Sequence, residues 1–456
     1  MFKGFKLIGY ILTKLRFMYY IVETPEQLAK LKPSEDCFID IITLNDNFHP
    51  AINSVSLLYY HNRQKGYILA VNHSEALNLP IPEIQAFLDS HDRVFCLDSK
   101  LARYYITTDN LQDLSQIIID EISKVPDLYC DTKIQRDLYT RLYHKKDLNR
   151  VIPISKLYEK SECLYEKVKS YMKKDGTGSV VKRIEKIYKS IECRGIRVDE
   201  KILDKYFETK WKPYSIQDGL LYSYYNLHNI TGRPTNSFNT VNFLALNKDK
   251  GCREAFLPVN NAFVEYDFEG YHLKLISKLI RFDFNSLESI HTVLGRMYFN
   301  VEELTEDQYK QSKELSFKQI YGGISDEYKN IPFFKKISAF IEQLWETYSL
   351  NGYLDLPTGR RLRSIEGMYP QKLFNYYLQN CETISNLFLL ENIQDYLKDK
   401  KSFITLVVYD SILIDFNFED GKEVLTTIKD IIYNKGLTSK VKYGSNYNSL
   451  RKTNYL

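Results

Sequence analysis

Two apolar runs that each carry one aspartate constrain the fold of this chain most. AFVEYDF at 262–268 places Asp267 where a strand gives way to a helix, and SFITLVVYDSILIDF at 402–416 encloses Asp410 between two strands. An ionised carboxylate is costly to bury in such a run unless a cation or hydrogen bonds compensate it. For either residue alone, an exposed turn aspartate is the commoner case. Together they predict neighbouring strands whose carboxylates meet at a divalent metal site.

A helix expected at 308–324 adds a second, independent pattern. Lys313, Phe317 and Tyr321 recur every four residues and so lie near one face, and Gly322 and Gly323 follow directly. An amphipathic core helix with a snorkelling lysine has the same spacing. The glycines favour a binding role, because they let a ligand approach the backbone closely. A cation and two rings beside a metal site indicate nucleotidyl transfer on a nucleoside triphosphate.

Composition sets the frame for these motifs. The 456 residues are 44% apolar, enough for two or three domains with their own cores. The formal charge of +4 is weak evidence for a polyanionic partner. The seven cysteines are scattered and form no CxxC pair, so we expect neither a disulfide framework nor a zinc site, and a reducing cytoplasm fits best.

The first 18 residues are treated as an N-terminal extension. The stretch between Lys6 and Lys14 is too short for a signal core and far too short to span a bilayer. The sequence therefore predicts neither export nor contact with a membrane, and a cytoplasmic protein.

The rest of the chain changes character along its length. Short apolar runs alternate with polar turns from Tyr19 to about residue 150, which indicates an α/β domain. A long amphipathic helix is expected from Val180 to Ile191, with Gly195 as its stop signal. A mainly helical block runs from the strand at Asp267 to about residue 400, and a basic tail ends the chain.

The ordered motifs resemble those of family A DNA polymerases, the DNA polymerase I type, in a divergent form similar to phage-encoded enzymes. The matching segments are TGRPTN at 231–236, REAFLP at 253–258, EYDFEGYHLKL at 265–275, KELSFKQIYGG at 313–323, GYLDLPTGRR at 352–361, NYYLQ at 375–379 and VVYDS at 407–411. The resemblance covers the chain from about Tyr19 onward.

The resemblance implies an α+β protein with a right-hand polymerase (palm, fingers and a shortened thumb), preceded by an α/β RNase H-like exonuclease-type domain. We expect a degenerate 3′-5′ exonuclease-like domain at 19–150, the thumb at 151–230, the first part of the palm at 231–285, the fingers at 286–384, and the rest of the palm with the C-terminal tail at 385–456.

Carried over by position, the resemblance implies that Asp267 and Asp410 hold two Mg²⁺ ions, for which Mn²⁺ can substitute, with the Phe268 carbonyl as a further ligand. The residues it places at the incoming nucleotide are His272, His291, Lys310, Lys313, Phe317 and Tyr321. Those it places at DNA are Arg233, Gly322, Asn375, Gln379 and Tyr409. A lone histidine is more often structural, so the role of His291 depends mainly on the resemblance.

The chain departs from the family pattern at several of these positions. His272 stands where the family has a glutamate that closes off the sugar 2′ position, and its bulk still favours deoxynucleotides. Phe317 in place of a tyrosine implies discrimination against dideoxynucleotides. Ser411 removes the second acid of the later metal motif. Tyr309 replaces an expected arginine, with Lys310 as a nearby substitute.

Two domains are also reduced. Only about thirty residues separate the RGIRVD segment at 194–199 from Thr231, so a short thumb predicts low processivity or an accessory processivity factor. In the exonuclease-like domain Asp40 and Asp131 remain, but Ile42 and Ala102 replace two expected acids. Two metals cannot be held there, which predicts a domain without proofreading activity.

The sequence thus predicts a DNA-templated DNA polymerase that acts on primer-template DNA and deoxynucleoside triphosphates, in the host cytoplasm if it is phage-encoded. Two alternatives stay open. One is a single-subunit RNA polymerase, against which His272 and Phe317 argue. The other is a catalytically inactive DNA-binding replication scaffold. The argument against it is the joint presence of Asp267, Asp410, Lys313 and Tyr321.

Overall fold

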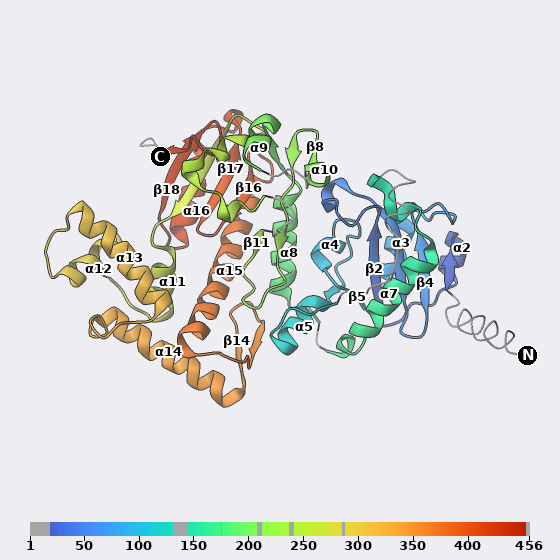
Figure 1. The fold of residues 1–456 in the computed structure, drawn as a ribbon, viewed down its shortest axis with the longest axis horizontal. Coiled ribbons are helices and arrows are strands. Elements are labelled where there is room, and N and C mark those ends of the chain that lie inside the picture. The colour runs from blue at the N-terminus through green and yellow to red at the C-terminus, as the bar shows by residue number, and fades with distance from the viewer. Residues whose placement is uncertain are drawn as a thin grey trace, which may run out of the picture. The chain divides into compact units, whose positions relative to one another are not determined.

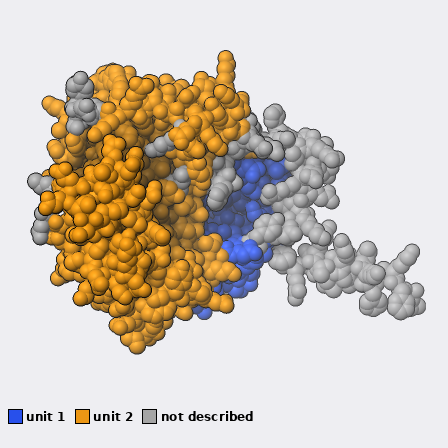
Figure 2. Space-filling model, turned by 60° about the vertical axis from the view of Figure 1, so that its left-hand side comes forward, with its two compact units in different colours: residues 1–118, 126–177 blue, residues 119–125, 178–456 orange. Residues whose placement is uncertain are grey.

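The computed structural model describes residues 19–128, 130, 145–174, 176–207, 212–236, 241–284 and 288–452, so the N-terminal extension lies outside the described residues. The chain forms two compact units, which Figure 2 distinguishes by colour. The first comprises Met1–Ile118 and Pro126–Thr177, and the second comprises Ile119–Val125 and Gly178–Leu456.

The first unit is built on a six-stranded mixed sheet with the order β1-β4-β3-β2-β5-β6. Its strands are β1 (Tyr20–Val22), β2 (Asp36–Thr43), β3 (Val55–His61), β4 (Gly66–Ala70), β5 (Arg93–Cys96) and β6 (Leu111–Asp113). β3 runs antiparallel to both of its neighbours, whereas β2, β5 and β6 are parallel to one another. The short apolar runs expected between Tyr19 and about residue 150 are confirmed as strands at β2, β3 and β4.

Helices cover both faces of this sheet. They are α2 (Pro25–Ala29), α3 (Ile81–Asp89), α4 (Ser99–Ala102), α5 (Leu114–Ile122) and α7 (Ile154–Val168). Successive strand residues point to opposite faces. Phe38 of β2 packs with residues of α5 and α7, while Cys37 and Ile39 pack with residues of α2 and α3. The near-continuous apolar run of β2 is explained by this burial on both sides.

One pair of cysteines corrects an expectation from the sequence. Cys130 and Cys163 form a disulfide within the first unit, with their Cα atoms 6.3 Å apart. The two residues are far apart in the chain and share no motif, so their spacing gave no sign of the pairing. Among the described residues, the disulfide does not involve Cys37, Cys96, Cys193, Cys252 or Cys381.

The second unit contains a five-stranded antiparallel sheet with the order β16-β17-β13-β18-β19. Its strands are β13 (Ala262–Phe268), β16 (Phe403–Val408), β17 (Ser411–Phe416), β18 (Ser439–Gly444) and β19 (Arg451–Lys452). β13 lies between β17 and β18, which places the strand of Asp267 beside the strand that follows Asp410. The predicted adjacency of the two aspartate-bearing runs is confirmed.

Smaller sheets complete the second unit. A four-stranded sheet has the order β12-β7-β9-β8, and two hairpin-like pairs stand apart from it. The strands are β7 (Ile196–Val198), β8 (Ile216–Gln217), β9 (Leu220–Leu221), β10 (Tyr225–Asn226), β11 (Thr235–Asn236), β12 (Phe256–Leu257), β14 (Tyr353–Asp355) and β15 (Arg361–Arg363).

The helices of the second unit gather around α15, which contacts α8, α11, α13, α14 and α16 (Figure 1). The set is α8 (Ser179–Glu192), α9 (Glu200–Tyr206), α10 (Lys212–Ser215), α11 (Tyr271–Leu279), α12 (Ile290–Phe299), α13 (Glu306–Gly322), α14 (Pro332–Asn351), α15 (Pro370–Leu397) and α16 (Glu423–Asn434). The helices expected around Val180–Ile191 and 308–324 are confirmed as α8 and α13.

Local signals explain where these helices begin and end. Thr305 and Gln308 form a capping box at the start of α13. Pro332 and Pro370 occupy the first turns of α14 and α15, where the missing N–H costs nothing. Gly352 ends α14 at a φ of 71°, a left-handed conformation that glycine adopts without a steric penalty. Among the described residues, no helix is long and apolar enough to cross a bilayer.

Candidate active site

The site is centred on the ends of β13 and of the β16–β17 hairpin. Asp267 pairs with Ser411 of β17 on one side and with Lys440 of β18 on the other. The Phe268 amide donates a 2.8 Å hydrogen bond to the Asp410 carbonyl. The backbone therefore fixes both aspartates at the same end of the five-stranded sheet.

The turn that carries Asp410 has an uncommon backbone. It consists of Tyr409 and Asp410, and Tyr409 has a φ of 52°, in the left-handed region that a non-glycine residue rarely adopts. The Asn386 side chain donates a 3.3 Å hydrogen bond to the Tyr409 carbonyl, and the Arg233 guanidinium lies 4.0 Å from the centre of the Tyr409 ring. These contacts hold the turn, and with it Asp410, in one conformation.

The electrostatics of the two carboxylates fit a cation site. Loss of solvation raises the pKa of Asp410, and the charge of Asp267 raises it further. All the donors at this point are oxygens, the ligands that Mg²⁺ and Mn²⁺ prefer. Asp267 and Asp410, with the Phe268 carbonyl beside them, are therefore the residues suited to hold divalent ions.

A lysine that the sequence had placed only in a basic tail contacts this site. The Lys442 ammonium lies 2.6 Å from Asp267 Oδ2 and 2.7 Å from Glu265 Oε2. Burial alone would lower the pKa of Lys442, but its hydrogen bonds to Asp267 and Glu265 raise it overall. Glu265 is almost fully buried, and this ammonium compensates its charge.

Helix α13 presents the expected side chains on one face. The Phe317 and Tyr321 rings are stacked, with centroids 6.1 Å apart and planes inclined by 8°. They are 43% and 37% exposed, and Tyr409 is 39% exposed, so three large rings face solvent around the carboxylates. One turn earlier, Lys313 Nζ lies 4.6 Å from the centre of the Tyr309 ring. The structure brings Lys313, Phe317 and Tyr321 together as the spacing predicted.

A chain of polar contacts links α13 to α11 and α15. His272 Nδ1 contacts the Tyr321 hydroxyl, and His272 Nε2 lies 2.8 Å from Glu382 Oε2. Arg233 donates to the other oxygen of the same carboxylate at 2.8 and 3.1 Å. An ionised carboxylate only accepts hydrogen bonds, so a neutral His272 donates through Nε2 and leaves Nδ1 to accept from Tyr321. Glu382, 2% exposed, is thus shared by two site residues.

His291 is buried at the start of α12. Burial, with the charges of Lys313 and Lys440, lowers its pKa to about 4, so the imidazole is neutral at pH 7. Its Nδ1 is buried and has no hydrogen-bond partner among the described residues. Its ring lies 5.9 Å from that of Phe317, which places it behind the exposed face of α13.

The remaining expected residues take different positions. Asn375 donates a 3.1 Å hydrogen bond to the Tyr321 carbonyl, at the end of α13 where Gly322 opens onto free space. Gln379 is half-buried one turn later on α15. Lys310 is 70% exposed, and its ammonium lies 3.8 Å from Asp307 Oδ1.

Three residues of this site were missed by reasoning from the sequence. Glu382 stands in a long helix with many apolar residues, where a buried acid is expensive unless it is paired, and that was an available signal. Lys440 and Lys442 alternate along β18, and their role became visible only once that strand was paired with β13. Pairing between distant strands cannot be read from local periodicity.

The first unit keeps the aspartate expected as an exonuclease remnant. Asp40 of β2 is withdrawn from solvent, which raises its pKa, and it accepts a 2.7 Å hydrogen bond from the Ser161 hydroxyl. Asp131 lies outside the described residues.

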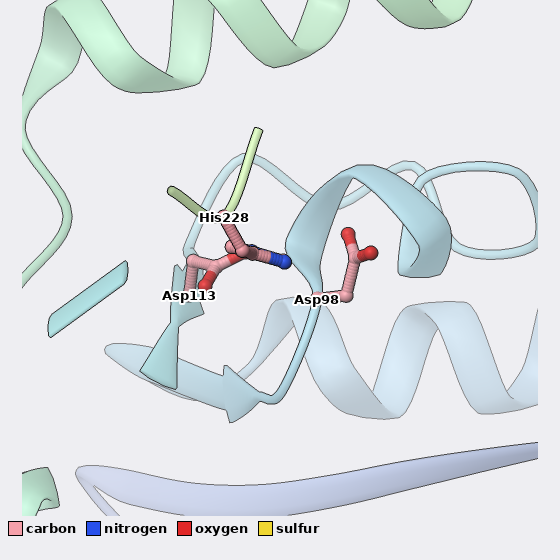
Figure 3. A group of neighbouring side chains, drawn as sticks. All are labelled: Asp98, Asp113 and His228. Atoms are coloured by element: carbon pink, nitrogen blue, oxygen red, sulfur yellow. The ribbon is translucent and has the colours of Figure 1, made fainter. Parts of the chain in front are cut away.

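Two further acids of this unit, Asp98 and Asp113, lie near each other in Figure 3. Asp98 caps α4 by accepting from the Leu101 amide at 2.8 Å, and Asp113 accepts from the Ser99 and Gln116 amides. Because backbone amides already use these oxygens, the two acids have a structural explanation. Figure 3 also draws His228, which belongs to the second unit.

Comparison with known proteins finds a likeness among solved structures. No protein-family model and no curated protein matches the sequence. Among solved structures, the chain is similar to the POL domain of Pol1 from M. smegmatis, solved in complex with DNA primer-template and dNTP. The TM-score is 0.64 at 14% sequence identity, and the match covers 95% of this chain and 100% of that one. At this identity the likeness shows a shared fold.

Proposed function

We propose that this chain is a DNA-templated DNA polymerase of the family A type that adds deoxynucleotides to a primer 3′ end. The observation that carries the proposal is the juxtaposition of Asp267 and Asp410 at one end of a sheet, with α13 presenting Lys313, Phe317 and Tyr321 beside them. The fold shared with a polymerase domain that was solved with primer-template and dNTP supports it.

The chemistry of the donors defines the cofactor. Asp267, Asp410 and the Phe268 carbonyl would hold two Mg²⁺ ions, which when bound lower the pKa of the primer hydroxyl and neutralise the triphosphate. Because Ser411 is not an acid, the hairpin supplies no third carboxylate. The two aspartates would then be the carboxylate ligands of both ions.

The protein's own side chains position the nucleotide. Lys313 meets the triphosphate as a point charge, Phe317 packs on the sugar, and Tyr321 stacks near the templating base. His272 occupies the sugar 2′ side, where its bulk excludes a hydroxyl group. Both His272 and Tyr321 are pre-oriented, because each is hydrogen-bonded in the free protein.

DNA contacts follow from the surrounding residues. Arg233 and Gln379 would face the duplex, Arg233 from its position over the Tyr409 ring. Asn375 and Gly322 lie where α13 ends, and the absence of a side chain at Gly322 gives the template base room to approach.

The same proposal assigns parts of the chain to a right hand. The sheet with β13 and the β16–β17 hairpin is the palm, and α12 to α14 with the first half of α15 are the fingers. The thumb is short. Of the segment 151–230 assigned to it, residues up to Thr177 pack in the first compact unit, which leaves α8 to β10.

The first unit is proposed as an exonuclease-like domain without proofreading activity. Its Asp40 is half-buried and accepts a hydrogen bond from Ser161, and Ile42 and Ala102 supply no further acid. Metal-dependent removal of a mismatched primer 3′ nucleotide by the intact chain would overturn this part of the proposal.

Primer extension with Mg²⁺ tests the central claim. The intact chain should extend a primer on a DNA template with deoxynucleotides, and Asp410→Ala should not. Asp430→Asn, an exposed acid on α16 of the same unit, is the matched control and should keep full activity.

The outcomes separate the alternatives. Extension with ribonucleotides at comparable efficiency would identify an RNA polymerase. Binding of primer-template without extension by the intact chain would identify a catalytically inactive scaffold.

A further inference from the structure

The proposed triphosphate site lacks one cation on α13. Tyr309 stands one helical turn before Lys313, and the Lys313 ammonium lies against its ring at 4.6 Å from the centroid. The Tyr309 hydroxyl is 3.4 Å from Ser289 Oγ. This face of α13 therefore offers Lys313 as its cation, whereas a triphosphate carries several negative charges.

Lys440 of β18 approaches the same place from the sheet. It is directly opposite Asp267 in the antiparallel register, and side chains of such paired residues project from the same face. Its ammonium lies 3.0 Å from Glu269 Oε1, and both side chains of this pair are more than a third exposed. An ion pair so open to solvent contributes about 1 kcal/mol or less, so Lys440 can exchange Glu269 for another anion.

Lys440 and Lys313 lie near a common set of groups. Both charges act on the buried His291, and Lys440 is also within electrostatic range of Tyr309 and Asp267. Gly270 lies beside the same histidine, because a Cβ at that glycine would be 3.8 Å from His291 Nε2.

We propose that Lys440 is the second cation that binds the triphosphate of the incoming nucleotide, in place of the arginine that α13 lacks at position 309. The inference depends on the proposed polymerase function for its biological meaning. It replaces Lys310 in that role, because Lys310 faces solvent beside Asp307. On binding, Lys440 leaves Glu269 and donates to phosphate oxygens.

Lys440→Gln in the full chain tests the inference by steady-state primer extension at varied deoxynucleotide concentration. One lost charge-assisted hydrogen bond predicts a KM for the nucleotide raised about tenfold, with kcat and the affinity for primer-template little changed. Lys440→Arg should keep a KM near that of the original chain. Tyr309→Arg in the Lys440→Gln background should restore a low KM, because it returns a cation to the face of α13 that carries Lys313.

Lys401→Gln is the matched control. Lys401 forms an exposed ion pair with Glu419 in the same unit, and its loss should leave the KM unchanged. An unchanged KM in an active Lys440→Gln variant, or an equal rise in Lys401→Gln, would overturn the inference.

A binding measurement keeps this test separate from that of the proposed function. Calorimetric titration with inorganic tripolyphosphate needs no catalysis, so it applies even if the intact chain extends no primer. Binding that weakens about tenfold in Lys440→Gln and not in Lys401→Gln supports the cation site. Equal binding by the intact chain and both variants refutes it.

Discussion

His272 is held from two sides, by the Tyr321 hydroxyl on α13 and by the Glu382 carboxylate on α15. The imidazole ring is therefore held in one orientation, because its rotation would break two hydrogen bonds. Only a ring held in place can exclude a single extra hydroxyl group by its bulk.

Replacement of His272 by alanine should therefore relax sugar selection. We expect the ratio of kcat/KM for deoxynucleotides over ribonucleotides to fall by at least about tenfold, since the excluded volume is gone. Primer extension with each nucleotide type gives this ratio. Tyr321→Phe removes the hydroxyl contact but keeps both rings, so it should lower selection less. An equal loss in the two variants would show that selection depends on the hydrogen bond and not on bulk.

His291 predicts a pH dependence of stability. Burial and the charges of Lys313 and Lys440 lower its pKa to about 4, while Glu269 acts in the opposite direction. Below its ordinary pKa of 6.5 the unfolded chain takes up a proton that the folded chain refuses until about pH 4. The free energy of unfolding therefore falls on acidification, by about 2 kcal/mol between pH 7 and pH 5 from this residue.

Urea unfolding of the intact chain and of His291→Gln at both pH values measures this contribution. The variant should lose about 2 kcal/mol less between pH 7 and pH 5 than the intact chain. Subtraction of the change in the variant from the change in the intact chain cancels the contributions of other buried groups. These include His61 and His73, whose pKa values burial also lowers. The same pH dependence in both proteins would contradict the expectation.

At the scale of elements, α15 joins the site together through one residue. Glu382 of α15 accepts from His272 of α11 and from Arg233, and His272 in turn contacts Tyr321 of α13. Two segments distant in the sequence thus share one buried carboxylate, and α13 is joined to them through His272. Removal of one partner from such a buried network leaves the others with uncompensated charge.

Glu382→Gln should consequently destabilise the chain by about 3 kcal/mol, measured by urea unfolding. Glu391→Gln is the matched control on the same helix. Glu391 pairs with Arg183 at a more exposed position, with 25% and 40% of the two side chains accessible, so its loss should cost about 1 kcal/mol or less. Comparable losses in both variants would show that Glu382 does not anchor the network.

Elements that form from local patterns were the predictable part of this fold. The apolar run of β13 and the four-residue spacing on α13 could be recognised from their own residues, and so Asp267 and Tyr321 were expected at the site. Lys440 could not be assigned, because its role arises from a register with β13 set far away in the chain. The pairing of Cys130 with Cys163 was missed because the two residues are 33 positions apart and share no motif.

At the scale of the whole molecule, the proposed thumb is short in the described part of the second unit. Between α8 and β10 it contains the seven-residue α9, the four-residue α10 and the short strands β7 to β9. Contacts to the phosphate backbone supply most of the affinity for DNA, so fewer elements imply a shorter residence time.

We therefore expect few additions in each binding event. Extension of a labelled primer in the presence of a trap that captures released enzyme measures the product length directly. Products from the chain alone should be short and should shorten further as salt is raised, because the contacts are ionic. Long products without any other protein would remove the need for an accessory processivity factor.

The ion pairs of Lys442 with Glu265 and Asp267 determine the charge balance at the end of the sheet. Because the ammonium neutralises part of the acidic cluster, the free protein already carries its own counter-ion at the sheet end. A divalent ion that binds Asp267 therefore displaces the Lys442 ammonium instead of entering a site that has no counter-ion. Linkage between two binding events is reciprocal. A polyanion that draws Lys442 away from Asp267 therefore raises the affinity for the metal ion by the same factor by which the metal ion raises the affinity for the polyanion. Substrate and metal would in this way reinforce each other through a lysine that touches neither reacting atom.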